Sequence, residues 1–197
     1  MDVGAFLSSI QTIDLVLFLF FIGFFVLGFA QGTIRRLIGI ASILFSFLFA
    51  ANVAEALGSF LGQNWTQFPV EYSYMIGFGT VFIAASLAFA LIAQGFYKPQ
   101  PLFENARFVD EIIGGILGVV EFGVILGATI IILDTFFQLQ GIPASPNELL
   151  FLRDLWTALD SSAIVAVFRE TIIPFFFVIF GFLIPDNIEA YYPRFGS

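Results

Sequence analysis

The sequence predicts an all-α polytopic membrane protein with about four transmembrane helices and a C-terminal interfacial or re-entrant helical segment. Apolar residues make up 59% of the 197 residues and charged residues 11%, whereas soluble domains carry about 25% charged residues. Apolar stretches of about 20 residues, the length that crosses a bilayer, recur along the chain. Charged residues lie mostly between these stretches or near their ends. So little charge cannot cover a soluble globule, and most of the outer surface is expected to face lipid.

Four apolar stretches define the predicted transmembrane domain, which occupies residues 1–137. They cover residues 12–30, 37–61, 72–97 and 112–137. A short break from Gln31 to Arg36 separates the first two, and a polar turn at residues 62–69 follows the second. A segment with two prolines at residues 98–101 ends the third, because proline lacks a backbone donor.

Residues 138–197 are expected to form an outer loop with a short helix, followed by the C-terminal segment. Asn147 is a candidate cap of the short helix. Arg169-Glu170 and Pro174 interrupt the last apolar region, residues 163–184, so its uninterrupted part is shorter than the about 20 residues that a span requires. An interfacial or re-entrant helix is therefore favoured, and a fifth membrane helix is the alternative.

Basic residues indicate the orientation of the chain in the membrane. The first and third connections between spans contain Arg35, Arg36, Lys98 and Arg107, whereas the second contains no lysine or arginine. The positive-inside rule therefore predicts that the first and third connections are cytoplasmic and that the N-terminus is outside. We interpret Arg35 and Arg36 as topology determinants, with binding of lipid phosphate as the alternative.

The composition disfavours most enzyme mechanisms and several classes of partner. The chain has no cysteine and no histidine, so it lacks a thiolate nucleophile, an imidazole base and the commonest metal ligand. We find no nucleophile–base pair or metal-ligand spacing, and predict no catalytic residue, cofactor or metal site. The net charge of −8 argues against nucleic acid. The 29 phenylalanines suit lipid contact and helix packing, or alternatively a wall against pigment or quinone.

Glycines spaced four residues apart predict close helix packing, because small residues let two backbones approach. Four such pairs are Gly28/Gly32, Gly58/Gly62, Gly114/Gly118 and Gly123/Gly127. At about 100° per residue, Gly114 and Gly118 share a helix face with Asp110 and Glu121. Gly123 and Gly127 lie roughly opposite, together with Asp134. An alternative is a repeat of two helical hairpins, because the first and fourth stretches both begin with an acid and carry spaced glycines.

Glu121 is the only charge between Ile112 and Leu133. A lone acid at membrane depth costs at least ~2 kcal/mol, so it needs a partner, a proton or water. The functional interpretation is a proton-coupling or substrate-gating carboxylate. The structural interpretation is a glutamate that fastens this helix to another, with Arg169 as a candidate partner.

Three aspartates lie near predicted helix ends. Asp14 and Asp110 fall at the starts of the first and fourth stretches, where a carboxylate can accept from open amides and complement the helix dipole. Asp134 lies towards the C-terminal end of its stretch, which is an unfavourable place for an anion. A basic or hydrogen-bonding partner is therefore expected for Asp134.

Two blocks of residues carry a resemblance to a known family. The first is Ile13-Asp14, an apolar run and then Gly32-Thr33-Ile34-Arg35, and the second is Asp110, Gly114, Gly118 and a run closing on Leu133-Asp134-Thr135-Phe136. In order and spacing these blocks make residues 13–137 resemble the colicin V production protein (CvpA) family of small bacterial inner-membrane proteins. The chain departs from that pattern twice. The family often has an acid after the arginine, where this chain has Arg36, and a basic residue near the second glycine run, where Glu121 stands.

The resemblance implies residence in the bacterial cytoplasmic membrane and a role in toxin export or envelope homeostasis, with no catalytic residue or cofactor. The expected partners are lipid, further copies of the chain and other membrane proteins. One alternative is a proton- or ion-coupled transporter or channel whose path is lined by Glu121 and the aspartates. Another is an accessory subunit of a photosynthetic or respiratory assembly.

Overall fold

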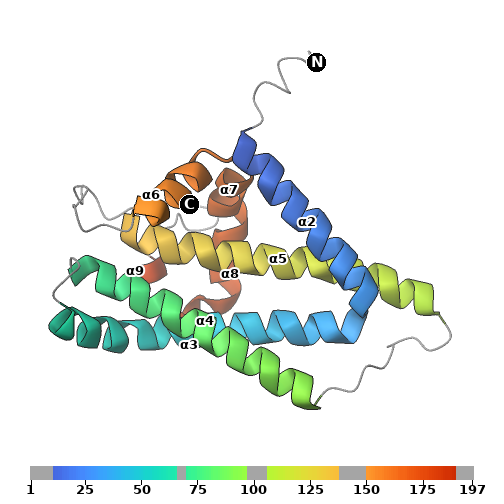
Figure 1. The fold of residues 1–197 in the computed structure, drawn as a ribbon, viewed down its shortest axis with the longest axis horizontal. Coiled ribbons are helices and arrows are strands. Elements are labelled where there is room, and N and C mark those ends of the chain that lie inside the picture. The colour runs from blue at the N-terminus through green and yellow to red at the C-terminus, as the bar shows by residue number, and fades with distance from the viewer. Residues whose placement is uncertain (1–10, 66–69, 97–105, 138–149, 190–197) are drawn as a thin grey trace.

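The computed structural model describes residues 11–65, 70–96, 106–137 and 150–189, and every regular element in these ranges is helical (Figure 1). The four longest helices are α2 (Thr12–Gln31), α3 (Thr33–Asn64), α4 (Val70–Phe96) and α5 (Arg107–Phe137). They are followed by α6 (Leu150–Asp160), α7 (Ala163–Val167), the π-helical turn η1 (Phe168–Ile172), α8 (Ile173–Phe180), the 3-10 turn η2 (Gly181–Leu183) and α9 (Asp186–Glu189). The predicted helix stop at residues 98–101 and the predicted cap Asn147 lie outside the described residues.

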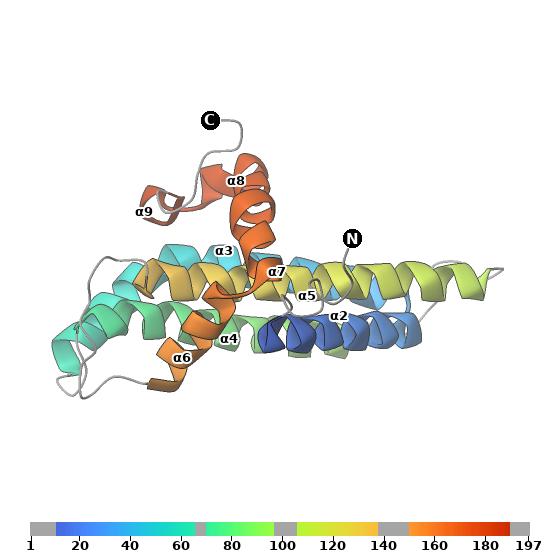
Figure 2. The same ribbon diagram turned by 90° about the horizontal axis from the view of Figure 1, so that it is seen from above.

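The four long helices form two crossed layers. Helices α3 and α5 lie beside each other in one layer, and α2 and α4 cross them in the other (Figures 1 and 2). Helix α2 packs along α5, and α3 packs along α4. Helix α8 projects beyond the layer of α3 and α5 (Figure 2).

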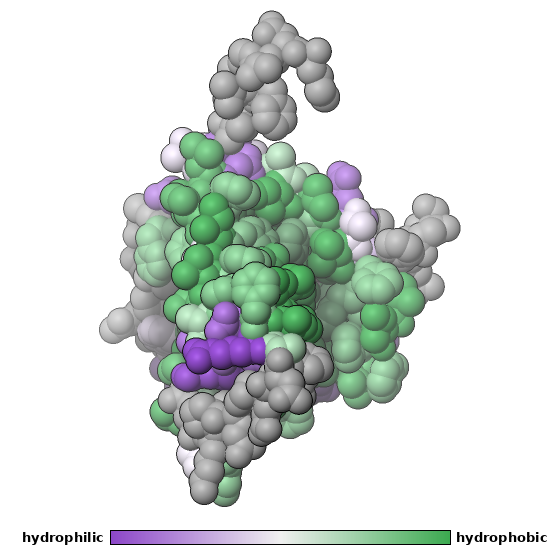
Figure 3. Space-filling model, turned by 90° about the vertical axis from the view of Figure 1, so that its right-hand side faces the viewer, coloured by the Kyte–Doolittle hydropathy of each residue, from purple (hydrophilic) through white to green (hydrophobic). Residues whose placement is uncertain are grey.

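The surface has the apolar character of a membrane protein. In the described residues, five helical segments are long and apolar enough to cross a membrane. Leu19 of α2 is 65% exposed and Leu91 of α4 is 68% exposed, and the face drawn in Figure 3 is hydrophobic except for small groups of hydrophilic residues. An all-α polytopic membrane protein is therefore confirmed, with five candidate spans where about four were expected.

The additional candidate span is Ala163–Leu183. Arg169 and Glu170 do not end the helix, because the backbone passes them as the π-helical turn η1. Pro174 lies in the first turn of α8, a position that proline tolerates. The length argument against a fifth membrane helix was therefore wrong. The segment crosses α5 steeply in both views (Figures 1 and 2), and its placement at the interface, as a re-entrant helix or as a span, stays a prediction.

The break between α2 and α3 is shorter than expected. It consists of Gly32 alone, because α3 already begins at Thr33 rather than near Leu37. Gly32 has φ of 77°, a left-handed conformation that glycine adopts without steric cost. The chain therefore turns from one membrane helix into the next within one residue.

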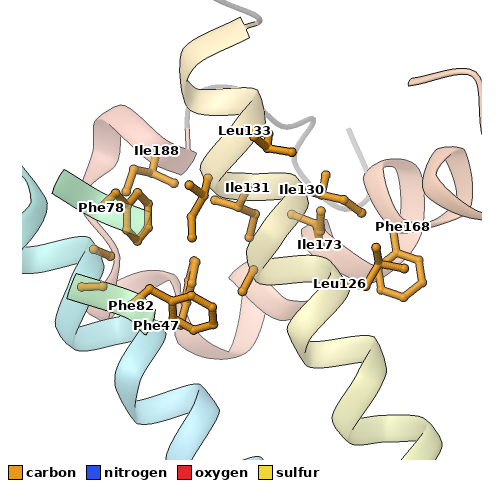
Figure 4. Packing of buried hydrophobic residues seen from close by; sticks show 14 of the residues in the cluster. Phe47, Phe78, Phe82, Leu126, Ile130, Ile131, Leu133, Phe168, Ile173 and Ile188 are labelled. Atoms are coloured by element: carbon orange, nitrogen blue, oxygen red, sulfur yellow. The ribbon is translucent and has the colours of Figure 1, made fainter. Parts of the chain in front are cut away.

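Helix α5 is the most enclosed of the candidate spans. In its most apolar 18-residue stretch, 50% of the residues are buried, against at most 28% in the corresponding stretches of the other candidate spans. The core between the helices is largely aromatic and β-branched (Figure 4). In it, the rings of Phe47 in α3 and Phe78 in α4 lie 5.6 Å apart, close to Ile131 of α5. This position of α5 brings its acids and glycines against three other helices.

Candidate functional site

A glycine seam joins α2 to α5, and we define it as Gly28, Gly114 and Gly118. A Cβ added to Gly114 would lie 2.5 Å from the carbonyl oxygen of Gly28, and one added to Gly28 or Gly118 would overlap a backbone carbonyl of the facing helix. Real Cβ atoms do not approach backbone so closely, so these positions require glycine. The structure thus brings glycines of the first and fourth predicted stretches into one backbone contact.

Gly32 and Asp110 meet at the end of this seam. A Cβ on Gly32 would lie 2.5 Å from Oδ2 of Asp110. The hydroxyl of Thr33 donates to the backbone carbonyl of Asp110 at 3.1 Å, and only 5% of Asp110 is exposed. Asp110 lies in the first turn of α5, as expected, and it also packs against the turn between α2 and α3.

Gly123 and Gly127 face a side chain rather than a backbone. A Cβ at either would lie 3.7–3.9 Å from the ring of Phe168, which is ordinary contact. The two glycines line an apolar hollow of about 400 Å³ between α5 and the C-terminal helical segment. The close backbone approach expected here is therefore not found, because an aromatic ring occupies the space on that face.

Glu121 forms an ion pair with Arg36 of α3. The side chains are 12% and 7% exposed, respectively. Arg36 also donates to Oε1 of Gln31 at 3.0 Å, and its guanidinium carbon lies 5.9 Å from the centre of the Phe24 ring. Gly39 provides room for the pair, since a Cβ there would overlap the Glu121 carboxylate.

This geometry corrects one sequence-based interpretation. The partner of Glu121 is Arg36 and not Arg169. Arg36 is buried inside the bundle, whereas its neighbour Arg35 is exposed, and their role as topology determinants stays a prediction. Arg36 and Glu121, the two positions at which the chain departs from the family pattern, thus form one ion pair. These two departures were the feature of the sequence from which the pair could have been predicted.

Asp134 is fully buried, with 0% exposure, and holds three elements together. Arg169 of η1 donates to both carboxylate oxygens, from Nε at 2.8 Å and from a terminal nitrogen at 2.7 Å. Trp156 of α6 donates to Oδ1 at 2.9 Å. Arg169 also forms an ion pair with Asp160 at the end of α6. The basic partner expected for Asp134 is therefore Arg169, which links α5 to the C-terminal segment.

Asp14 joins α2 to α7. Its carboxylate accepts from the hydroxyl of Ser162 at 2.5 Å and from the backbone amide of Ile164 at 3.2 Å. It also accepts from the amide of Gln11 at 3.4 Å, which caps the start of α2 itself. Asp14 therefore contributes to the caps of two helices. It caps α2, as expected, and it also accepts hydrogen bonds from the start of α7, where Ser162 lies 148 residues further along the chain.

Charged and polar contacts therefore fasten helices to one another. Glu121 ties α5 to α3, Asp134 ties α5 to α6 and η1, and Asp14 ties α2 to α7. Each carboxylate has a donor on another helix, which satisfies the charge where it is buried. Chemically, this arrangement supplies ion pairs and hydrogen bonds between helices.

Comparison with known protein families assigns the chain to one of them. A family model described as "Colicin V production protein" matches residues 13–173. The match extends beyond residue 137, where the resemblance was expected to end, and includes Arg169 and Ser162 as well as Arg36 and Glu121. No curated protein and no solved structure gives a significant match. The family model covers most of the chain, which therefore belongs to the colicin V production protein family of membrane proteins.

Proposed function

We propose that this protein is a helical scaffold of the bacterial cytoplasmic membrane that supports toxin export or envelope homeostasis through contacts with its own copies or with other membrane proteins. One observation carries the proposal: Asp14, Glu121 and Asp134, acids of the long apolar helices, are each held by a donor on another helix. Their proposed role is to hold the helices of the fold together.

A transporter would use the same acids differently. A coupling carboxylate must exchange partners or gain and lose a proton during each cycle. The bidentate contact of Arg169 with Asp134 and the buried pair of Arg36 with Glu121 oppose such exchange, because separating either pair leaves charge in a medium of low dielectric constant. Fixed pairs therefore favour a structural role over a transport path.

The exposed apolar surface supplies the contacts that a scaffold needs. Helix α2 presents Leu19 and Val26, which are 65% and 57% exposed, and α8 presents Val178, which is 67% exposed. In lipid, such surfaces associate by side-chain packing with other membrane helices. Helix α8 also projects beyond the layer of α3 and α5 (Figure 2), and its Phe175, Val178 and Ile179 are exposed to a neighbour.

Export of colicin V by cells that lack their own member of this family tests the proposal. We expect expression of this chain to restore secreted toxin. Gly118→Leu should abolish the restored toxin secretion, because the leucine side chain would force α2 away from α5. Gly23→Leu should retain the secretion, because nothing lies within 4 Å of a Cβ at Gly23.

Copy number and partners are measured in parallel by native mass spectrometry after mild extraction. The scaffold predicts complexes with a second copy or with another membrane protein. A membrane-inserted chain that restores no export, or one that restores export as an isolated monomer, would overturn the proposal.

A further inference from the structure

A second hollow, of about 810 Å³, lies between α2, α3, α4 and α5. Its walls are mostly apolar, and polar side chains gather around Arg35 and Arg36 near the start of α3. The rings of Phe45 in α3 and Phe89 in α4 lie 4.8 Å apart, which shows that the two helices run side by side here. The hollow extends from Arg35 near the start of α3 to Ala93 near the end of α4, and both ends fall on the predicted cytoplasmic side.

The hollow opens sideways, towards the region that lipid would occupy. Three of its lining residues are also exposed on the outside of the bundle: Leu27 of α2 is 48% exposed, and Ile83 and Leu87 of α4 are 59% and 61% exposed. A molecule can therefore reach the hollow from within the bilayer, between α2 and α4.

Unsatisfied donors point to a ligand at the polar side. Arg36 is only 6% exposed, and within the described part of the chain its Nε has no hydrogen-bond partner. The hydroxyl of Ser86, which also lines the hollow, is likewise buried and unpartnered among the described residues. A buried donor without an acceptor is unfavourable, so an acceptor oxygen placed here would be bound.

The charges of the hollow favour an anion. Arg35, Arg36 and Glu121 all line it, and the Glu121 carboxylate already pairs with Arg36. The sum of the three charges is +1, carried in effect by Arg35. The start of α3 adds the positive end of a helix dipole. An acceptor with one negative charge, such as a phosphate diester, therefore complements the site.

We propose that this hollow binds one anionic phospholipid of the surrounding bilayer. The headgroup phosphate accepts from Arg35 and from Nε of Arg36, and an acyl chain lies along Phe82, Ile83 and Leu87. The apolar walls and the opening towards lipid favour this amphiphile over a soluble anion. The site is independent of the role in export and stands or fails separately from it.

Lipid titration of the delipidated full-length protein, followed by native mass spectrometry, tests the site. The probes are phosphatidylglycerol, phosphatidylcholine and soluble glycerol phosphate. We expect phosphatidylglycerol to bind at least about tenfold more tightly than phosphatidylcholine, because the choline cation cancels the charge of the phosphate diester and leaves the positive charge of the hollow uncompensated. Glycerol phosphate should bind negligibly, because it leaves the apolar walls uncovered.

Two variants locate the bound lipid. Arg35→Gln removes the net charge and should weaken phosphatidylglycerol by about tenfold, and Leu87→Trp should exclude the acyl chain. Arg107→Gln is the control, since it removes the same charge from a side chain that is 85% exposed and outside the hollow. Arg35 is exposed, so its variant reports on binding even if Leu87→Trp does not fold.

Three results would overturn the proposal. They are equal affinity for the two lipids, lipid binding that Arg35→Gln leaves unchanged, and glycerol phosphate binding as tightly as phosphatidylglycerol. The last would assign the site to a soluble anion.

Discussion

Glu121→Gln is expected to leave Arg36 as an uncompensated cation inside the bundle. The arginine side chain is only 7% exposed, and after the change it keeps its hydrogen bond to Gln31 and its place near the Phe24 ring, while the amide oxygen of the new glutamine can replace a hydrogen bond but not the negative charge. Breaking one side of a buried pair costs about 3–5 kcal/mol. Because these two contacts remain, we expect a loss near the lower end, about 3 kcal/mol, or roughly a hundredfold in the unfolding equilibrium.

The free energy of unfolding, measured in bicelles by steric trapping, gives this quantity directly. A double-mutant cycle separates the ion pair from its surroundings. Arg36→Met and Glu121→Met should each destabilise, whereas the two together should be close to wild type, because an apolar pair of similar volume replaces a buried ion pair at little cost. Arg36→Glu with Glu121→Arg should recover most of the stability, since the combined reach of the two side chains is unchanged.

The chain contains a matched control for this experiment. Arg107 and Glu111 form an arginine–glutamate pair on the surface of α5, with Arg107 85% exposed. Glu111→Gln should cost less than about 0.5 kcal/mol, as exposed pairs at this spacing do. The reasoning is refuted if Glu121→Gln is as mild as this control, or if the double methionine variant is as unstable as the single ones.

Three further changes test the other helix contacts. Gly118→Ala should lower the unfolding free energy by about 2 kcal/mol because its Cβ overlaps backbone, whereas Gly23→Ala should be neutral or stabilise by up to about 1 kcal/mol; equal effects in the same unfolding assay would contradict the seam. Asp134→Asn should destabilise by about 3 kcal/mol because Arg169 loses its buried bidentate partner and keeps only the exposed Asp160, and a loss under about 1 kcal/mol would contradict the structural role of this pair. Ser162→Ala should lower hydrogen-exchange protection of α7 by about 1 kcal/mol, because it removes both the bond to Asp14 and the acceptor of the Val165 amide, while the exposed Ser161→Ala leaves it unchanged; unaltered protection in both would contradict this capping of α7.

The membrane class and the positions of four helices could be predicted because length and apolar content are local properties of the chain. The limits of the helices were less predictable. The predicted break at Gln31 to Arg36 shrinks to Gly32, because the left-handed glycine lets α3 begin at once and Arg36 is neutralised by a residue 85 positions away. Polarity alone could not distinguish a loop arginine from a paired one.

The candidate acids were also identified from sequence, but not their partners. Helical spacing placed Asp110, Gly114 and Gly118 on one face, and α2 occupies that face. The same spacing could not show that an aromatic ring faces Gly123 and Gly127, nor that Arg169 reaches Asp134 through a π-helical turn. The hollow between the four long helices depends on how they cross, which no periodicity encodes.

Ion flux across sealed vesicles that contain the purified protein tests the central claim most directly, because that claim assigns the acids of the apolar helices to holding the helices together. With an imposed proton or potassium gradient, the account predicts the same flux as in protein-free vesicles. A gradient-driven flux that appears with the wild-type chain and disappears with Glu121→Gln would contradict it.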